Sequence, residues 1–145
     1  MMIVNDGGRA AAGFKGIAGD CVTRAIAIAA EMEYVTVYDA LNSLTAAHRS
    51  RGKRSSSRTG VPKDITRKYL DMLGWRWTPT MGIGTGCTVH ARREELPSGR
   101  LILRLSRHCV AMIDGVIHDT YDPTRGGTRC VYGYWKNELD NLDIK

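Results

Sequence analysis

The sequence predicts an α+β domain in which N-terminal helices pack on a C-terminal antiparallel sheet. Apolar residues recur at helical spacing in the first half of the chain, and after Pro97 they form short extended runs instead. Two of these runs flank Asp114-Gly115, a dipeptide that strongly favours a two-residue hairpin turn. Because neither an internal repeat nor a linker interrupts the pattern, we expect a single domain over residues 1–145.

The first expected helix follows an irregular lead-in over residues 1–18 and lies within GDCVTRAIAIAA, residues 19–30. Asp20 is a good N-cap, since its carboxylate can accept hydrogen bonds from the free N–H groups of the first turn. The small apolar residues that follow form a narrow stripe, which allows very close packing on a neighbouring element. Cys21 is therefore expected at the N-terminus of a buried helix.

The remaining elements follow from periodicity and from the residues that end each run. A second helix is expected over residues 36–47, and a third begins at Pro62, which suits a first helical turn, and stops at Gly74. Residues 75–81 predict a strand that Pro79 pushes toward a sheet edge. The other expected elements are a short helical turn at 91–96 and strands at 101–106, 108–113, 116–121 and 129–134.

The composition favours a soluble protein. Of the 145 residues, 43% are hydrophobic, which is enough for one core, and no run approaches the roughly 18 apolar residues of a membrane span. The N-terminus lacks the basic-then-apolar order of a secretory signal, so we expect a cytoplasmic location.

The chain has four widely separated cysteines: Cys21, Cys87, Cys109 and Cys130. Disulfide frameworks are typical of short secreted chains, so we expect all four to be free thiols. Cys87 and His90 have the spacing of a metal-ligand pair, which Cys130 or His108-Cys109 would complete. Because structural zinc sites usually consist of two close pairs, we expect no metal.

The formal net charge is +6, and much of the excess lies in HRSRGKRSSSR, residues 48–58, which has no acidic residue. A charge run of this kind is typical of a solvated loop. It would also suit contact with an acidic protein, an acidic substrate or nucleic acid. No aromatic residue is interleaved to stack on bases, which argues against nucleic acid.

Three features together indicate a nucleophilic site. Cys21 lies where a helix dipole and unpaired N–H groups lower the pKa of a thiol. His108, in SRHCVAMID, begins an expected strand that would hold its imidazole in place as a base. The partner strand of the same hairpin, in HDTYDP, supplies an acid to orient the ring. Arg24, one helical turn after Cys21, is either a partner of the thiolate or an ordinary exposed or ion-paired arginine.

Two aspartates compete for the orienting role, and the length of the turn decides between them. If Asp114-Gly115 forms a two-residue turn, His108 lies opposite Tyr121, and the period of two places Asp119 diagonally beside it. A three-residue turn would instead place Asp122 opposite His108.

The order Cys, His, Asp resembles that of the papain-like cysteine peptidases. GDC and the helix at 19–30 resemble the nucleophile helix of that fold, and RHCVAMIDGVIHDTYDP, residues 107–123, resembles its histidine hairpin. The closing Asp-Pro is similar to that of bacteriocin-leader peptidases and some bacterial effector proteases, in which this aspartate completes the triad. The resemblance therefore favours Asp122, which we take first, whereas pleat counting favours Asp119. The chain also resembles small uncharacterised proteins of bacteria and their phages.

In the papain-like family, a glutamine, asparagine or similar side chain several positions before the cysteine usually stabilises the oxyanion. The corresponding segment here, FKGIAG, has no such side chain. Asn5 is the nearest amide, and Lys15 or the backbone N–H of Cys21 are the substitutes. Losing an oxyanion donor commonly costs about 100- to 1000-fold in rate, so this departure bears on peptidase efficiency.

These observations predict a papain-like thiol hydrolase in the cytoplasm of a bacterium or a phage-infected host cell. It would be a peptidase, or an acyltransferase with the same acyl-enzyme, that acts on a peptide or isopeptide bond through Cys21, His108 and Asp122 or Asp119. We expect a peptide or protein substrate, no cofactor and no membrane. The alternative is a non-catalytic binding domain on the same fold, in which the basic segment 48–58 holds an acidic protein or nucleic acid.

Overall fold

The computed structural model describes residues 2–15, 19–48, 56–58, 60–82 and 84–137, and it confirms the α+β class. Within these residues there are three α-helices and one six-stranded mixed sheet. The helices are α1 (Cys21–Ala29), α2 (Tyr34–His48) and α3 (Lys63–Met72), and a 3-10 turn, η1, covers Arg93–Glu95. The strands are β1 (Met2–Val4), β2 (Trp75–Pro79), β3 (Arg100–Leu105), β4 (His108–Ile113), β5 (Val116–Asp119) and β6 (Gly133–Asn137).

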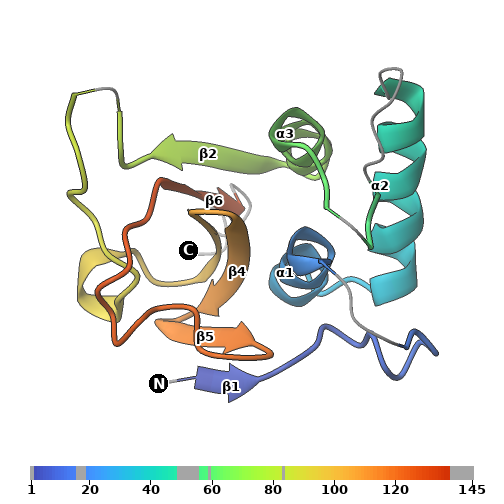
Figure 1. Cartoon of the computed structure of the whole chain (residues 1–145), viewed down its shortest axis with the longest axis horizontal. Helices are drawn as coiled ribbons and strands as arrows, with labels where there is room; N and C mark the ends of the chain where they lie inside the picture. Colours follow the sequence, from blue (N-terminus) through green and yellow to red (C-terminus); the bar gives the residue numbers. More distant parts are fainter. Residues whose placement is uncertain (1, 16–18, 49–55, 59, 83, 138–145) are drawn as a thin grey trace, which may run out of the picture.

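The strand order in the sheet is β1-β5-β4-β3-β6-β2, so strands from both halves of the chain take part. β2 lies at one edge, as Pro79 predicted, and pairs antiparallel with β6. β1 lies at the other edge and pairs parallel with β5 (Figure 1). The expectation of an irregular lead-in was therefore wrong for residues 2–4, and the sheet is mixed rather than antiparallel as expected. A strand of three residues is too short to show an alternating pattern.

The last strand begins later than expected, at Gly133 rather than at Arg129. Most of the residues before it pair with a loop: the Ala91 N–H donates to the Arg129 carbonyl, and the Val131 N–H donates to the Val89 carbonyl, whereas the Tyr132 N–H donates to the Arg104 carbonyl of β3. Residues 129–131 therefore pair with the loop at 89–91, and contact with the sheet begins at Tyr132.

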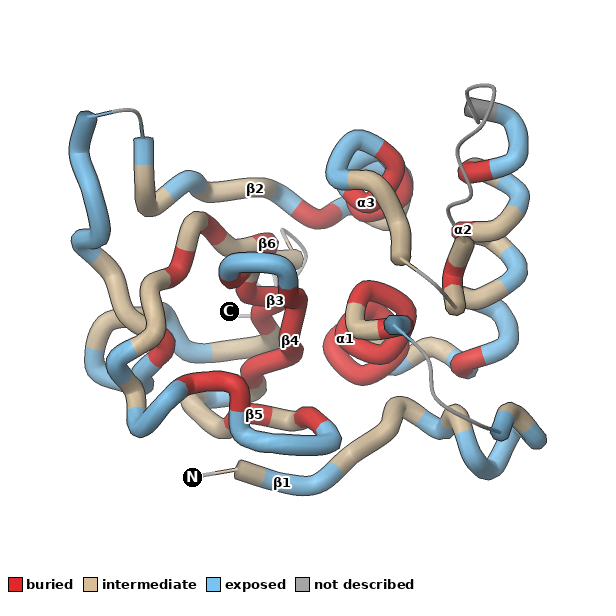
Figure 2. Tube along the Cα trace, viewed as in Figure 1, coloured by how far each residue is buried: buried red, intermediate tan, exposed pale blue. Residues whose placement is uncertain are grey.

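Helix α1 lies between the sheet and α2 and packs closely on β4 (Figure 1). Every residue of α1 after Cys21 is buried, so the helix is enclosed almost all round (Figure 2). Its alanines, Ala25, Ala27 and Ala29, allow this close approach because they add little volume. A second apolar cluster covers the opposite face of the sheet, with Leu101, Leu103, Val110 and Met112 at its centre.

The hairpin between β4 and β5 has the predicted two-residue turn. Ile113 pairs with Val116, and both turn residues have positive φ, +48° at Asp114 and +82° at Gly115. Positive φ at both central residues is the requirement of a type I′ turn, which glycine meets without strain and aspartate tolerates. This turn fixes the register that brings His108 and the end of β5 together.

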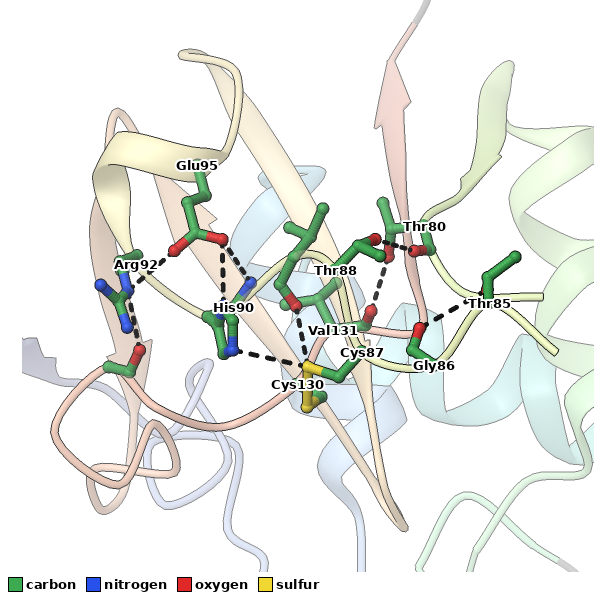
Figure 3. Close-up of a disulfide and its surroundings, with 12 residues drawn as sticks. Thr80, Thr85, Gly86, Cys87, Thr88, His90, Arg92, Glu95, Cys130 and Val131 are labelled. Atoms are coloured by element: carbon green, nitrogen blue, oxygen red, sulfur yellow. Dashed lines mark hydrogen bonds and ion pairs between the residues drawn. A yellow bond between two sulfur atoms is a disulfide. The ribbon is translucent and has the colours of Figure 1, made fainter. Parts of the chain in front are cut away.

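The cysteines divide into two groups. Cys21 and Cys109 are free, as predicted, whereas Cys87 and Cys130 form a disulfide, so the expectation of four free thiols was wrong for this pair (Figure 3). The two residues are 43 positions apart, and a β-bridge between His90 and Cys130 brings their segments together. Sequence spacing carries no signal for a contact that depends on loop pairing.

Candidate active site

Cys21 is the first residue of α1, and His108 is the first residue of β4. Because α1 packs along β4, the beginnings of these two elements meet. The Cys21 thiol and the His108 ring line the same pocket and each shifts the pKa of the other, and the backbone N–H of Cys109 also lowers the pKa of the thiol. The structure thus brings together the two residues that the sequence proposed as nucleophile and base.

The carboxylate beside His108 belongs to Asp119, at the end of β5. Its Oδ2 lies 2.7 Å from His108 Nε2, and both side chains are buried. Because Nε2 is taken by Asp119, Nδ1 is the ring nitrogen left for Cys21. The preference for Asp122 was therefore wrong about which carboxylate contacts His108. Pleat counting from a two-residue turn identified Asp119 correctly.

Asp122 has a local structural role. Its Oδ1 accepts hydrogen bonds from both the backbone N–H and the hydroxyl of Thr124, at 2.9 and 2.7 Å. These contacts hold the turn around Pro123, and they lower the pKa of Asp122. The aspartate that is not beside His108 thus stabilises the turn.

Asp20 does not cap α1, contrary to the sequence prediction. Its carboxylate makes no cap hydrogen bond and is buried, where it accepts hydrogen bonds from the Arg24 guanidinium and, at 2.5 Å, from the Tyr34 hydroxyl. A buried carboxylate next to a guanidinium gains a charge-assisted hydrogen bond in which both partners carry a charge. The Asp20 side chain therefore makes no hydrogen bond to the N–H groups at the start of α1.

Arg24 is buried and joins two carboxylates, which makes it an ion-paired residue rather than an exposed one. Besides Asp20, it contacts Asp119, with 3.2 Å between Nη2 and Oδ1. Burial raises the pKa of Asp119, but the hydrogen bond to His108, the Thr120 N–H and the charges of His108 and Arg24 outweigh it and hold the pKa below its ordinary value. Arg24 therefore helps to keep Asp119 ionised beside the histidine.

The electrostatics of the pair favour a thiolate and an imidazolium. Burial raises the pKa of Cys21, but the hydrogen bond to His108, the Cys109 N–H and the charges of His108 and Arg24 together hold the pKa below its ordinary value. Burial lowers the pKa of His108, but the hydrogen bonds to Asp119 and Cys21 and their charges raise it to about 9. A lowered thiol pKa and a raised imidazole pKa are the conditions for an ion pair at neutral pH.

Three other residues of the hairpin and the segment after it, Cys109, His118 and Tyr121, have separate contacts. Cys109 is buried, its sulfur accepts a hydrogen bond from Arg104 at 3.4 Å, and burial raises its pKa to about 12. His118 lies on β5, and its Nδ1 is 3.3 Å from the Asn5 amide nitrogen. Tyr121 was not proposed as a site residue, although register counting placed it opposite His108; its ring centroid lies 5.5 Å from that of His108.

The two side chains proposed for the oxyanion lie elsewhere. Asn5 follows β1; its amide contacts His118, and its side-chain oxygen accepts a hydrogen bond from Gly7. Lys15 is exposed, and its carbonyl accepts hydrogen bonds from Arg9 and Arg58. Neither lines the pocket at Cys21. Of the three candidates, the backbone N–H of Cys21 is the one that lies at the site.

A pocket of about 390 Å³ opens at Cys21 and His108. Arg104, Arg107, Val61 and Tyr121 also line it, so its wall carries positive charge. Arg104 lines a second, more apolar pocket of about 470 Å³, together with Trp77, Trp135, Tyr132 and Met81. Trp75 and Trp135 are buried in the core, whereas Trp77 both packs on Trp135 and faces this second pocket.

The basic segment proposed as a contact surface falls mostly outside the described residues, which include only 56–58 of its second half. Ser57, at its end, is buried; its N–H donates to Asn42, and its carbonyl accepts a hydrogen bond from Thr23 of α1 at 3.0 Å. The end of the segment is therefore fixed to α1 and α2.

Comparisons with known protein families, with curated proteins and with solved structures find no match to this chain. None of the helices that the structure describes has the length and apolar character needed to cross a membrane.

Proposed function

We propose that the protein is a papain-like thiol hydrolase that cleaves peptide or isopeptide bonds. One observation carries the proposal: a half-buried thiol at the N-terminus of a buried helix shares a pocket with a histidine that lowers the pKa of the thiol, and Nε2 of that histidine lies 2.7 Å from a buried carboxylate. Nucleophile, base and orienting group within hydrogen-bond reach are the signature of nucleophilic catalysis. The chain order of Cys21, His108 and Asp119, and their placement on a helix and a hairpin, are similar to those of papain-like peptidases.

In the proposed reaction, the Cys21 thiolate attacks the carbonyl carbon of the scissile amide. The N–H groups at the start of α1 stabilise the resulting oxyanion, helped by the positive end of the helix dipole. His108 then donates its proton to the leaving nitrogen, the C–N bond breaks, and a thioester remains on Cys21. His108 next takes a proton from water, and the hydroxide formed attacks the thioester and releases the carboxylic acid and the thiolate.

Asp119 and Arg24 act on the histidine rather than on the substrate. Asp119 holds the ring by Nε2 and stabilises the imidazolium, as the carboxylate of a triad does. Arg24 fixes Asp119 from the side of the helix. The two neighbouring pockets that share Arg104 supply a positively charged rim at the nucleophile and an apolar recess beyond it, which suits a peptide with an apolar side chain.

Covalent trapping tests this proposal. A peptide that carries a vinyl sulfone or chloromethyl ketone is expected to label the protein once, at Cys21, within minutes at neutral pH. Cys21→Ser should abolish labelling, and His108→Ala should slow it at least tenfold, because the thiolate loses its counter-ion. Mass spectrometry of the labelled peptide identifies the site. Labelling that is as slow as that of free cysteine, or that His108→Ala leaves unchanged, would contradict the proposal.

A further inference from the structure

Apart from the candidate active site, one other cluster of reactive side chains stands out in the described part of the chain. The ligand atoms of Cys87, His90 and Cys130 all lie within 4.8 Å of one another. His90 Nε2 faces the sulfur of Cys87 at 3.5 Å, and the ring points toward the disulfide (Figure 3). We propose that, after reduction of the disulfide, these three residues bind a Zn²⁺ ion, so that the same two cysteines form either a disulfide or a metal site.

The separation of His90 from Cys87 already suits a tetrahedral zinc site, and the two sulfurs would move apart once the disulfide is reduced. With Zn–S near 2.3 Å and Zn–N near 2.0 Å, tetrahedral ligands are separated from one another by about 3.5–3.8 Å. His90 Nε2 is already at that separation from the Cys87 sulfur. Thiolate and imidazole are both donors that suit Zn²⁺, and a set of two thiolates and one imidazole combines them. Three protein ligands leave a fourth position for water.

A carboxylate fixes the histidine in the orientation that ligation requires. Glu95 Oε1 lies 3.1 Å from His90 Nδ1 and also accepts a hydrogen bond from the His90 backbone N–H at 2.9 Å. Arg92 holds the other oxygen of Glu95 at 2.9 Å. Zinc-bound histidines usually donate their second ring N–H to such a carboxylate, which fixes the tautomer and increases the basicity of the ligating nitrogen.

The fold decides which of the residues named from the sequence completes the set of ligands. The expectation of no metal depended on the absence of two close ligand pairs. Cys87 and His90 form one pair, and the bridge between His90 and Cys130 brings the remaining cysteine to it, whereas His108 and Cys109 lie at the candidate active site and in the core. Cys87 is exposed, and His90 and Cys130 are half-buried, so both a reductant and a metal ion have access.

The conversion of the disulfide to a zinc site takes two steps, each balanced in electrons and protons. A dithiol reductant attacks the disulfide, passes through a mixed disulfide and leaves as its own cyclic disulfide, so that two electrons and two protons convert Cys87 and Cys130 to thiols. Zn²⁺ then binds the two thiolates and His90, and the two thiol protons are released to solvent. Disulfides are rare where cellular thiols are reducing, so the metal would keep the two loops joined under those conditions.

Metal titration tests the inference independently of any hydrolase activity. The protein is prepared as the Cys21→Ser variant, so that the half-buried thiol of the candidate active site cannot bind metal. After reduction with a phosphine and removal of the excess, Co²⁺ is titrated in, and the thiolate-to-cobalt charge-transfer absorption is recorded. We expect one Co²⁺ per chain, displaced by one equivalent of Zn²⁺, and no binding by the oxidised protein.

Matched variants separate this site from adventitious binding. Cys130→Ser and His90→Ala should each weaken Zn²⁺ binding by at least about 100-fold, and Glu95→Gln by about 10- to 100-fold. His118→Ala removes a histidine outside the cluster and should leave the affinity unchanged. Circular dichroism shows that each variant is folded. Reduced protein that takes up no stoichiometric metal, or that binds it equally well without His90 or Cys130, would overturn the proposal.

Discussion

Replacing Asp119 by alanine is expected to lower kcat/KM for a peptide that the wild type hydrolyses by on the order of 10³- to 10⁴-fold. The carboxylate is the group that fixes His108 Nε2, at 2.7 Å, and that holds the imidazolium in place. Without it the ring is free to rotate, the pKa of His108 falls, and the proton for the leaving nitrogen is no longer positioned. Steady-state kinetics at neutral pH measure the loss.

Two further variants make this expectation specific. Asp122→Ala removes the neighbouring aspartate, which contacts Thr124 and not His108, and should change kcat/KM no more than a few-fold. Asp119→Asn keeps a hydrogen-bond acceptor for the ring but loses the charge, so it should retain more activity than Asp119→Ala and remain folded. If Asp122→Ala cost as much activity as Asp119→Ala, the assignment of the orienting residue would be wrong.

The second large effect is on stability: Arg24→Met should lower the free energy of unfolding by about 3–5 kcal/mol. The guanidinium contacts the buried carboxylates of Asp20 and Asp119, and its removal leaves Arg9 as the remaining cationic neighbour of Asp20 and His108 as that of Asp119. Methionine keeps much of the side-chain volume, so packing changes little. Urea denaturation at pH 7 measures the difference between the two proteins.

A control variant and a pH series show whether the loss of stability in Arg24→Met comes from the lost charge or from altered packing. Arg92→Met removes a more exposed ion pair with Glu95 and should lower stability much less, because solvent screens such pairs. The pKa of Asp119 is lowered in the folded wild type, so its stabilisation is present above its ordinary pKa of 3.8 and is lost as the pH falls through the folded value. The gap between Arg24→Met and wild type should therefore narrow in acid; a gap independent of pH would indicate packing instead.

Much of the fold could be predicted because local signals agreed with tertiary contacts. Pro62 and Gly74 marked the ends of α3 to within two residues. Pro79 indicated the edge position of β2, and Asp114-Gly115 specified the turn of the hairpin. That turn also decided the register of the candidate site. Counting residues from the hairpin turn identified Asp119 as the partner of His108. The resemblance to a known motif pointed to Asp122, which instead stabilises the turn around Pro123.

The features that were missed depend on contacts between segments far apart in the chain. Asp20 has the identity and position of an N-cap, but the buried guanidinium of Arg24 and the hydroxyl of Tyr34 take its carboxylate. The Cys87–Cys130 disulfide depends on a bridge between two loops, which neither spacing nor periodicity reveals. Asn5 was the nearest amide in sequence, yet the pairing of β1 with β5 places it beside His118.

The central claim is that His108 makes the Cys21 thiol reactive, and the pH dependence of alkylation tests it most directly. In the oxidised protein, iodoacetamide reports on Cys21, because Cys109 is buried with a pKa of about 12 and the other two cysteines are joined. The rate in the wild type should reach half its maximum well below the ordinary thiol pKa of about 8.5. In His108→Ala the midpoint should rise to or above that value. The histidine no longer lowers the pKa of Cys21, so the rise caused by burial outweighs the remaining contacts. The same midpoint at or above about 8.5 in both proteins would contradict the account.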